Sequence, residues 1–148
     1  MSHQPVRDSV RAFFDGFARA SQALDVAALG AMFGDVFLNL SPTSVGPVTR
    51  EVFTSALPGR ERLFGSIGAT GTALTELSET VLDDMHTLAH TTWRVRFGPD
   101  APADRTLTLS ADYLLRQEDG RWRIVAYLNH QDIVAVIRAM RDQPTGAG

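Results

Sequence analysis

The chain has 148 residues, of which 44% are hydrophobic and 21% are charged, and its formal net charge at pH 7 is −3. It lacks the basic patch that dominates nucleic-acid binding, and no apolar run is long enough to cross a bilayer, so we expect neither nucleic acid nor membrane as a partner. Cysteine is absent, which excludes disulfides, thiolate nucleophiles and cysteine-bound zinc. The length fits one domain over residues 1–148, and the N-terminus lacks the layout of a signal peptide, so we expect a cytoplasmic location.

The first third of the chain has the pattern of helices. In residues 5–24, apolar side chains recur every three or four positions, which predicts an amphipathic helix that begins near Pro5. Asp25 is placed to cap a second, shorter helix that ends near Gly34. Residues 35–42 then predict a short extended run that ends in proline.

The middle of the chain is the least regular part. Residues 43–71 are rich in Gly, Pro, Ser and Thr, which predicts mainly loop. One or two helical turns are expected in each of the stretches 49–57 and 59–67.

From Thr72 onward, apolar and polar residues alternate, which is typical of β-strands. The predicted strands cover residues 72–84, 86–97, 105–117 and 121–130. The last two form a hairpin through a tight turn at 118–120. A short helix over about 132–142 then precedes a frayed tail.

Helices followed by a run of long antiparallel strands define the α+β class. Strands with one apolar face need the helices to cover that face. If the sheet curves around the N-terminal helix, it leaves a cone with a pocket at the open end.

Three stretches of the chain carry a family resemblance: "VRAFFDGFARA" in the first helix, "DVAALGAMFGDVFLNLSP" in the second helix and first strand, and "YLLRQEDGRWRIVAYL" in the hairpin. Together they resemble the NTF2-like superfamily, which includes SnoaL-like polyketide cyclases and ketosteroid isomerases, over roughly residues 6–132. The resemblance implies an NTF2-like cone, with the N-terminal helices packed in a strongly curved, mainly antiparallel sheet around an apolar cavity for a small molecule. It also implies a homodimer through the outer face of the sheet.

The catalytic residues of ketosteroid isomerases are matched only in part. Where those enzymes have a general-base aspartate this chain has Ser41, and where they have a tyrosine on the first helix it has Phe17. Neither side chain supports that proton transfer near neutral pH. Asp112, eight residues before Gly120, does match their protonated aspartate. The steroid isomerase reaction is therefore not expected, and Asp112 remains a candidate acid.

Two further kinds of site are also not matched. No Arg-x-Asp lies on a predicted strand, as limonene epoxide hydrolases would require. Scytalone dehydratase-like sites use a pair of His with Tyr and Asp. This chain has those residue types in His86, His90, Asp112 and Tyr113, but their spacing does not match. His86 and His90 are four residues apart on one strand, about 13 Å, which is too far for both to bind one metal ion. We therefore expect no metal and no cofactor.

Asp112 receives two opposed predictions. Strict alternation along its strand turns it outward, as a solvated or interface carboxylate. Alignment with the isomerases turns it into the pocket, which a β-bulge would allow, and there it would be a candidate acid.

The stretch "YLNHQDI", residues 127–133, gathers polar side chains at the end of the last strand. Tyr127 and Asn129 share a face and either bind a carbonyl or hydroxyl group in the pocket or pack with their polar tips bonded to backbone. His130 is either a general base oriented by Asp132 or an imidazole bonded to backbone. Asp132 most simply caps the last helix.

The sequence therefore predicts a pocket with two sets of functional residues. The candidate catalytic residues are Asp112, His130 and Tyr127. The candidate ligand-binding residues are Phe17, Trp93, Asn129 and Asn39. The leading function is a cofactor-free isomerase, cyclase or dehydratase that uses general acid–base chemistry on an apolar, carbonyl-bearing substrate, and the alternative is a non-catalytic ligand-binding or dimerisation module. Asp112 or His130 pointing into the cavity favours the enzyme, whereas both turned outward favour the binding module.

Overall fold

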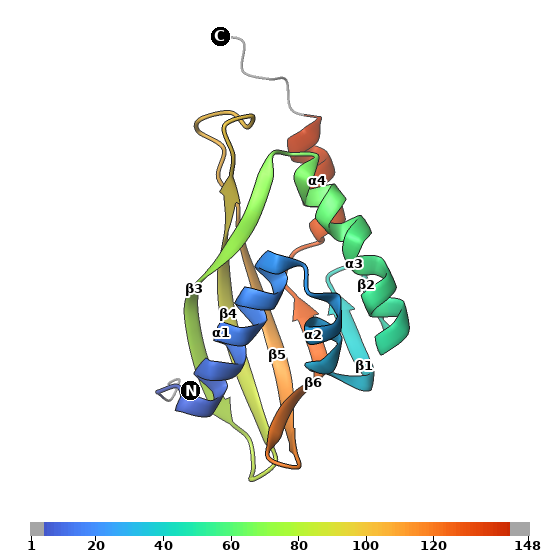
Figure 1. Cartoon of the computed structure of the whole chain (residues 1–148), viewed down its shortest axis with the longest axis vertical. Coiled ribbons are helices and arrows are strands. Elements are labelled where there is room, and N and C mark those ends of the chain that lie inside the picture. The colour runs from blue at the N-terminus through green and yellow to red at the C-terminus, as the bar shows by residue number, and fades with distance from the viewer. Residues whose placement is uncertain (1–4, 143–148) are drawn as a thin grey trace.

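The computed structural model describes residues 5–142, in which there are four helices and six strands (Figure 1). The helices are α1 (Asp8–Ala23), α2 (Val26–Ala31), α3 (Arg50–Gly65) and α4 (Ile133–Arg141). The strands are β1 (Phe33–Ser41), β2 (Ser44–Thr49), β3 (Ala69–Val81), β4 (His86–Phe97), β5 (Thr108–Glu118) and β6 (Arg121–Asn129). None of these four helices is long and apolar enough to cross a membrane. The predicted frayed tail, residues 143–148, lies outside the described residues.

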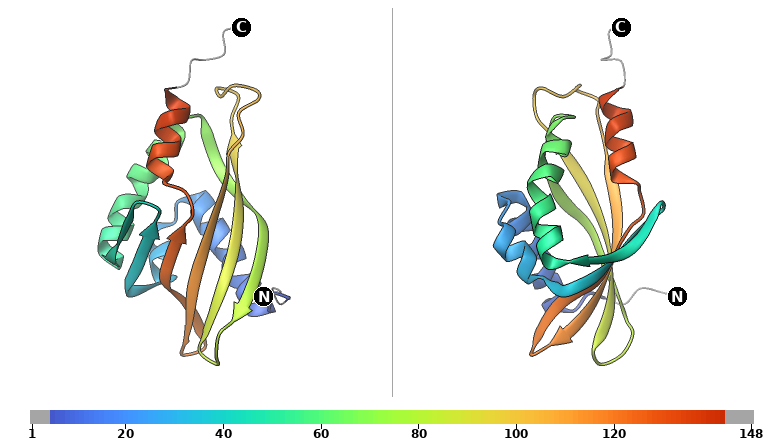
Figure 2. Two further views of the ribbon diagram at one scale, coloured as in Figure 1. Left: turned by 180° about the vertical axis from the view of Figure 1, so that it is seen from behind. Right: turned by 90° about the vertical axis from the view of Figure 1, so that its right-hand side faces the viewer.

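The six strands form one sheet in the order β2-β1-β6-β5-β4-β3, in which β1 and β6 are parallel and all other neighbours antiparallel. The sheet bends strongly, and α1, α2 and α3 lie against its concave side, with α4 beside the C-terminal end of α3 (Figures 1 and 2). The predicted α+β cone, with helices packed inside a curved and mainly antiparallel sheet, is confirmed.

The core of the cone forms around α1, whose apolar side chains repeat at helical spacing and face the sheet. Val10 and Phe14 are fully buried, and Phe17 packs against the same cluster. The centroid of the Phe14 ring lies 5.2 Å from that of Tyr113 and 6.0 Å from that of Phe17. The predicted amphipathic helix is therefore confirmed, but it begins at Asp8 and not near Pro5.

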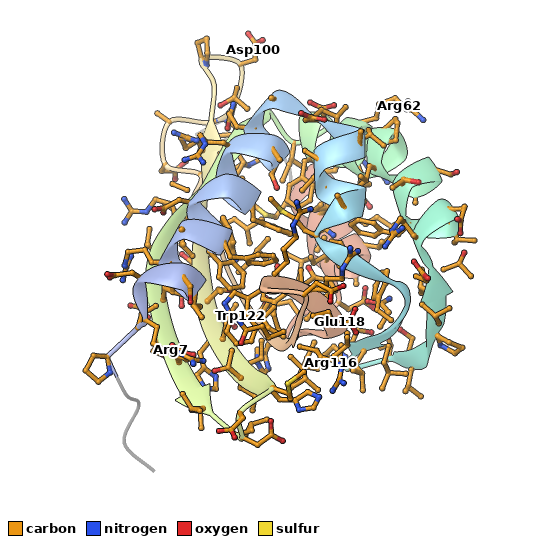
Figure 3. All side chains as sticks on the ribbon, turned by 60° about the horizontal axis from the view of Figure 1, so that its bottom comes forward. Arg7, Arg62, Asp100, Arg116, Glu118 and Trp122 are labelled. Carbon is orange, nitrogen blue, oxygen red and sulfur yellow. The ribbon has the colours of Figure 1, made fainter. Side chains whose placement is uncertain are left out.

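An ion pair with a buried carboxylate fastens the beginning of α1 to β3. The side chain of Glu79 has no exposed surface. Its Oε2 accepts from Nε of Arg7 at 2.9 Å and from the hydroxyl of Thr87 at 2.6 Å, and its Oε1 accepts from the backbone N–H of Arg7 at 3.0 Å. Burial by itself raises the pKa of Glu79, but these hydrogen bonds outweigh burial and hold the pKa below its ordinary value. Arg7 also lies over Trp122, 5.2 Å from guanidinium carbon to ring centroid (Figure 3).

The middle of the chain is more regular than predicted. Residues 43–71 contain strand β2 and one continuous helix of 16 residues, α3, instead of a loop with isolated turns. Thr49 caps this helix by accepting from the N–H of Val52 at 3.2 Å. Pro58 lies inside α3, where it removes a backbone hydrogen bond. Packing of α3 against α2 and the sheet offsets that loss. Pro58 and Gly59 together also make the sequence read as a loop, which is why the continuous helix was not predicted there.

A β-bulge in β6 decides which of its side chains face the helices. One residue, Val125, is inserted between two consecutive pairs that β6 forms with β5. Strict alternation predicts that Ile124 and Tyr127 lie on opposite faces of the sheet. The bulge instead brings both to the concave side, where both are buried.

The last helix begins at the predicted cap. One carboxylate oxygen of Asp132 accepts from the N–H of Ala135 at 3.2 Å. The other accepts from the hydroxyl of Thr43 at 3.2 Å. Asp132 therefore caps α4 and also ties it to the turn between β1 and β2.

Candidate functional site: an apolar cavity with a polar wall

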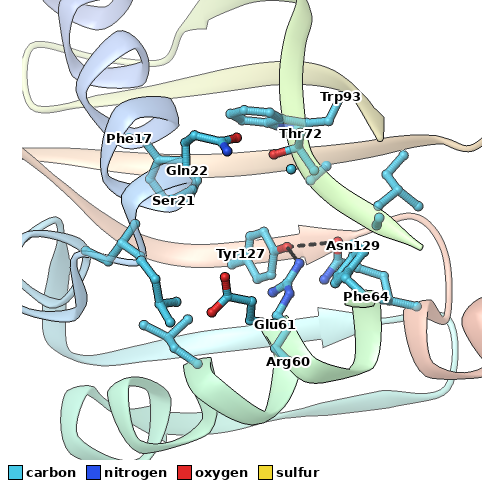
Figure 4. A pocket seen from close by; sticks show the side chains of 18 of the residues that line it. Phe17, Ser21, Gln22, Arg60, Glu61, Phe64, Thr72, Trp93, Tyr127 and Asn129 are labelled. Atoms are coloured by element: carbon cyan, nitrogen blue, oxygen red, sulfur yellow. Dashed lines mark hydrogen bonds between the residues drawn. The ribbon is translucent and has the colours of Figure 1, made fainter. Parts of the chain in front are cut away.

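A cavity of about 490 Å³ lies between the C-terminal half of α1, helix α3 and the concave face of the sheet (Figure 4). Aromatic rings from five different elements form much of its wall: Phe17, Phe33, Phe53, Trp93 and Tyr113. Small-molecule sites typically occupy about 300–1,000 Å³ and have mainly apolar walls with a few polar groups. Both the size and the lining of this cavity fit such a site.

One wall of the cavity carries a chain of three polar side chains. The hydroxyl of Tyr127 donates to Oδ1 of Asn129 at 2.9 Å, and the same hydroxyl accepts from a guanidinium nitrogen of Arg60 at 3.4 Å (Figure 4). Tyr127 and Asn129 come from β6, and Arg60 comes from the facing helix α3. The ring of Tyr113 lies 4.8 Å from that of Tyr127 and packs beside this chain. The arrangement presents donors and acceptors to a molecule in the cavity.

Two groups in this wall have fixed protonation states. Burial, followed by the neighbouring Tyr127, raises the pKa of Tyr113 well above its ordinary value of 10.0, so its phenol stays neutral. The pKa of Arg60 is raised, mainly by Tyr127 and against the effect of burial, so its guanidinium stays charged. The wall therefore combines a neutral phenol with a permanent positive charge.

Polar side chains also stand at the edge of the cavity. The amide of Gln22 donates to the carbonyl of Thr70 at 3.3 Å and accepts from Arg96 at 3.0 Å. Gly71 permits this approach, since a Cβ there would lie 2.1 Å from Oε1 of Gln22. Glu61 is exposed, and its carboxylate points toward the cavity (Figure 4). Within residues 5–142, Glu61 is the one acidic side chain in the lining, and no histidine contributes to it.

No family model and no curated protein matches the sequence, but solved structures do. An NTF2-like protein from Shewanella oneidensis is 16% identical, with 84% of this chain and 98% of that chain covered and a TM-score of 0.67. An NTF2-like protein with a cystatin-like fold from Novosphingobium aromaticivorans is 16% identical, with 90% and 87% covered and a TM-score of 0.67. The chain has the NTF2-like fold. A candidate scytalone dehydratase from N. aromaticivorans is 13% identical, with 82% and 80% covered and a TM-score of 0.63. At these identities the likeness establishes the fold alone.

Four of the predicted site residues line the NTF2-like cavity: Phe17, Trp93, Tyr127 and Asn129. Asn39 does not line it. The cavity meets β1 at Phe33, and Asn39 lies further along that strand, where its Cα pairs with that of Tyr127 on β6. A ligand-binding role for Asn39 stays a prediction.

Asp112 and His130 lie on the outer face of the NTF2-like sheet, and neither lines the cavity. One oxygen of Asp112 lies 3.1 Å from Nδ1 of His90, and the other lies 3.3 Å from Nε2 of His130. The outward position follows from strict alternation along β5, on which Ala111 and Tyr113 face the cavity. Asp112 does not take the inward position that the resemblance implies, because the bulges of this sheet fall in β1, β3 and β6 and not in β5.

The four side chains that could form a scytalone dehydratase-like site do not come together in this structure. The ring nitrogens of His86 lie 2.9 Å from a carboxylate oxygen of Asp83 and 3.0 Å from Arg116. His90 pairs with Asp112 on the outer face, whereas Tyr113 faces the cavity. Across residues 5–142, no group of three or more His, Asp or Glu side chains is placed to hold a metal ion.

Sequence reasoning missed Arg60 and Glu61, because it predicted separate helical turns over 49–57 and 59–67 and not the continuous helix α3. A signal was present in the spacing of apolar residues. Phe53, Leu57 and Phe64 fall on one helical face, and the turn between the last two is occupied by Arg60 and Glu61. Arg60 interrupts this apolar face and is partly buried, and a charge is costly to bury without a partner, so its position was a signal for a polar wall.

Proposed function

We propose that the protein binds a small, largely apolar molecule in the cavity and holds a carbonyl or hydroxyl group of that molecule at Tyr127 and Asn129. The observation that carries this proposal is a hydrogen-bonding pair on one wall of a cavity otherwise lined mainly by aromatic and aliphatic side chains. Burial of hydrocarbon against such walls contributes about 25 cal/mol per Å² to affinity. The polar pair would then fix the orientation of the ligand.

The Tyr127–Asn129 pair can change partners without moving the backbone. The hydroxyl hydrogen of Tyr127 rotates about the C–O bond, so it can leave Oδ1 of Asn129 and donate to a ligand oxygen. The amide nitrogen of Asn129 offers a second donor. Both side chains stand on β6, which is paired with β1 on one side and β5 on the other. A site on a strand held from both sides keeps its geometry.

Catalysis on the same molecule is a second candidate function, and Glu61 favours it. A cofactor-free isomerase, cyclase or dehydratase needs one group that removes a proton and another that supplies it. Tyr127 is the predicted catalytic residue that lies in the cavity, and the carboxylate of Glu61 points toward the same space (Figure 4). Asp112 and His130 face away from it. Loss of turnover in Glu61→Gln with binding retained would identify Glu61 as the base, and unchanged turnover would exclude it.

The binding proposal is tested with N-phenyl-1-naphthylamine, an uncharged probe whose fluorescence rises in apolar sites. Two competitors of the same shape then displace it: 2-acetonaphthone, which has a carbonyl group, and 2-ethylnaphthalene, which has a CH₂ in its place. We expect the ketone to bind about fivefold more tightly, since one net hydrogen bond contributes about 1 kcal/mol. Tyr127→Phe and Asn129→Ala should each reduce that preference. Absence of probe binding, or equal displacement by the ketone and the hydrocarbon, would refute the proposal.

A further inference from the structure

The cavity contains a positive charge that no acidic residue neutralises. Arg60 is the one basic side chain in the lining supplied by residues 5–142. Its hydrogen-bond partner is the hydroxyl of Tyr127, at 3.4 Å, and its guanidinium carbon lies 5.8 Å from the centroid of Phe64. The ion pairs found in this part of the chain do not include Arg60. A guanidinium in an apolar wall, held by a phenol and a benzene ring alone, is an uncommon arrangement.

We infer that the ligand is an organic anion: an apolar ring system that carries a carboxylate, or an equally acidic enol, and places it against Arg60. This inference rests on the proposed function, since it specifies the chemical class of the molecule that the cavity binds. The guanidinium is planar and presents its donors in a fork that matches the two oxygens of a carboxylate.

Arg60 has donors to offer such an anion. One guanidinium nitrogen donates to Tyr127, and the other nitrogens donate to no group among the described residues. In the same part of the chain, the one buried side-chain polar atom without a partner is Nε of Arg50. The remaining N–H donors of Arg60 are therefore not buried, and they are accessible to a ligand. Figure 4 shows the side chain directed from α3 toward Tyr127, on the wall that also carries Asn129.

The neighbouring carboxylate of Glu61 does not neutralise the charge of Arg60. Glu61 follows Arg60 in the sequence, but it is exposed to solvent and forms no ion pair with Arg60. Interactions of exposed charges are weakened by water and salt, whereas a charge in an apolar wall is screened much less. Arg60 therefore dominates the potential along the Tyr127 wall.

The test compares two competitors of equal shape against bound N-phenyl-1-naphthylamine: 2-naphthoate, which is an anion at pH 7, and 2-naphthamide, which is neutral. We expect 2-naphthoate to displace the probe from the wild-type protein at a concentration about tenfold lower, as a charge-assisted hydrogen bond allows. Arg60→Gln should make the two competitors equal, and Arg60→Lys should retain part of the preference. Because the readout is a ratio within each variant, altered probe affinity or stability cancels.

Arg62→Gln is the matched control. It removes the same charge from the same helix, but Arg62 is exposed and does not line the cavity (Figure 3). The preference for 2-naphthoate should survive in this variant. Equal displacement in the wild type, or a preference that persists in Arg60→Gln, would overturn the inference while leaving the proposed function standing. Failure of the probe to bind the wild type would overturn both.

Discussion

Replacement of Phe14 by alanine is expected to lower the free energy of unfolding by about 3–5 kcal/mol, the usual cost of emptying a phenylalanine site in a packed core. Phe14 has no exposed surface, and its ring packs against Tyr113 of the sheet and Phe17 of its own helix. The loss is large because the sheet that wraps α1 is paired strand to strand and cannot collapse into the space left behind. Urea unfolding followed by far-UV circular dichroism measures the change.

Phe13→Ala is the control for that experiment. Phe13 precedes Phe14 on the same helix and is only half-buried, so the same substitution should cost less than half as much. Equal losses in the two variants would mean that the packing between α1 and the sheet has been assigned to the wrong helical face.

Replacement of Arg7 by alanine is expected to cost about 2 kcal/mol at pH 7, because it leaves the carboxylate of Glu79 buried without its main partner. The cost lies below that of a fully buried pair, since the Arg7 side chain is 44% exposed and water can replace part of it. The pKa of Glu79 is depressed in the folded protein, so the stability it contributes is present above its ordinary pKa of 4.5 and is lost as the pH falls through the folded value. The difference between wild type and Arg7→Ala should therefore shrink on acidification below pH 4.5.

The pH dependence separates this ion pair from a general effect of charge. Arg11→Ala removes the same charge from the exposed side of α1, where no ion pair forms with any residue in the range 5–142. Its free energy of unfolding should stay within about 0.5 kcal/mol of the wild type. A gap between wild type and Arg7→Ala that stays constant as the pH is lowered from 7 to well below 4.5 would contradict the role of Glu79 in this ion pair.

The fold could be predicted from the sequence because its main elements have clear local patterns of apolar and polar residues. The helical spacing of Val10, Phe14 and Phe17 identifies α1, and the alternation along β4 and β5 identifies the strands. Helix α3 could not be predicted in the same way. Pro58 and Gly59 oppose a helix locally, and only packing against α2 and the sheet holds the segment in one.

The cavity residues on the strands were predicted, whereas those on helix α3 were missed. Trp93 and Tyr127 reach the cavity as expected, but Arg60 depends on α3 and could not be placed without it. Alternation gave the correct outer face for Asp112, because β5 is regular. The same rule failed between Ile124 and Tyr127, where the bulge at Val125 shifts the register. A bulge is set by the curvature of the whole sheet, and that curvature is not a local property of the sequence.

Contact between a ligand and Trp93 tests the central claim most directly, since the chain has two tryptophans in different surroundings. Trp93 lines the cavity, whereas the indole of Trp122 donates to Ser9 at 3.2 Å at the opposite end of α1. The ligand is 4-bromoacetophenone, an apolar aryl ketone whose bromine quenches indole emission on contact. In Trp122→Phe, the emission of Trp93 should fall with a saturable dependence on ligand concentration, while in Trp93→Phe the emission of Trp122 should stay nearly constant. Saturable quenching of Trp122, or quenching of both indoles in simple proportion to concentration, would contradict a ligand site inside the cone.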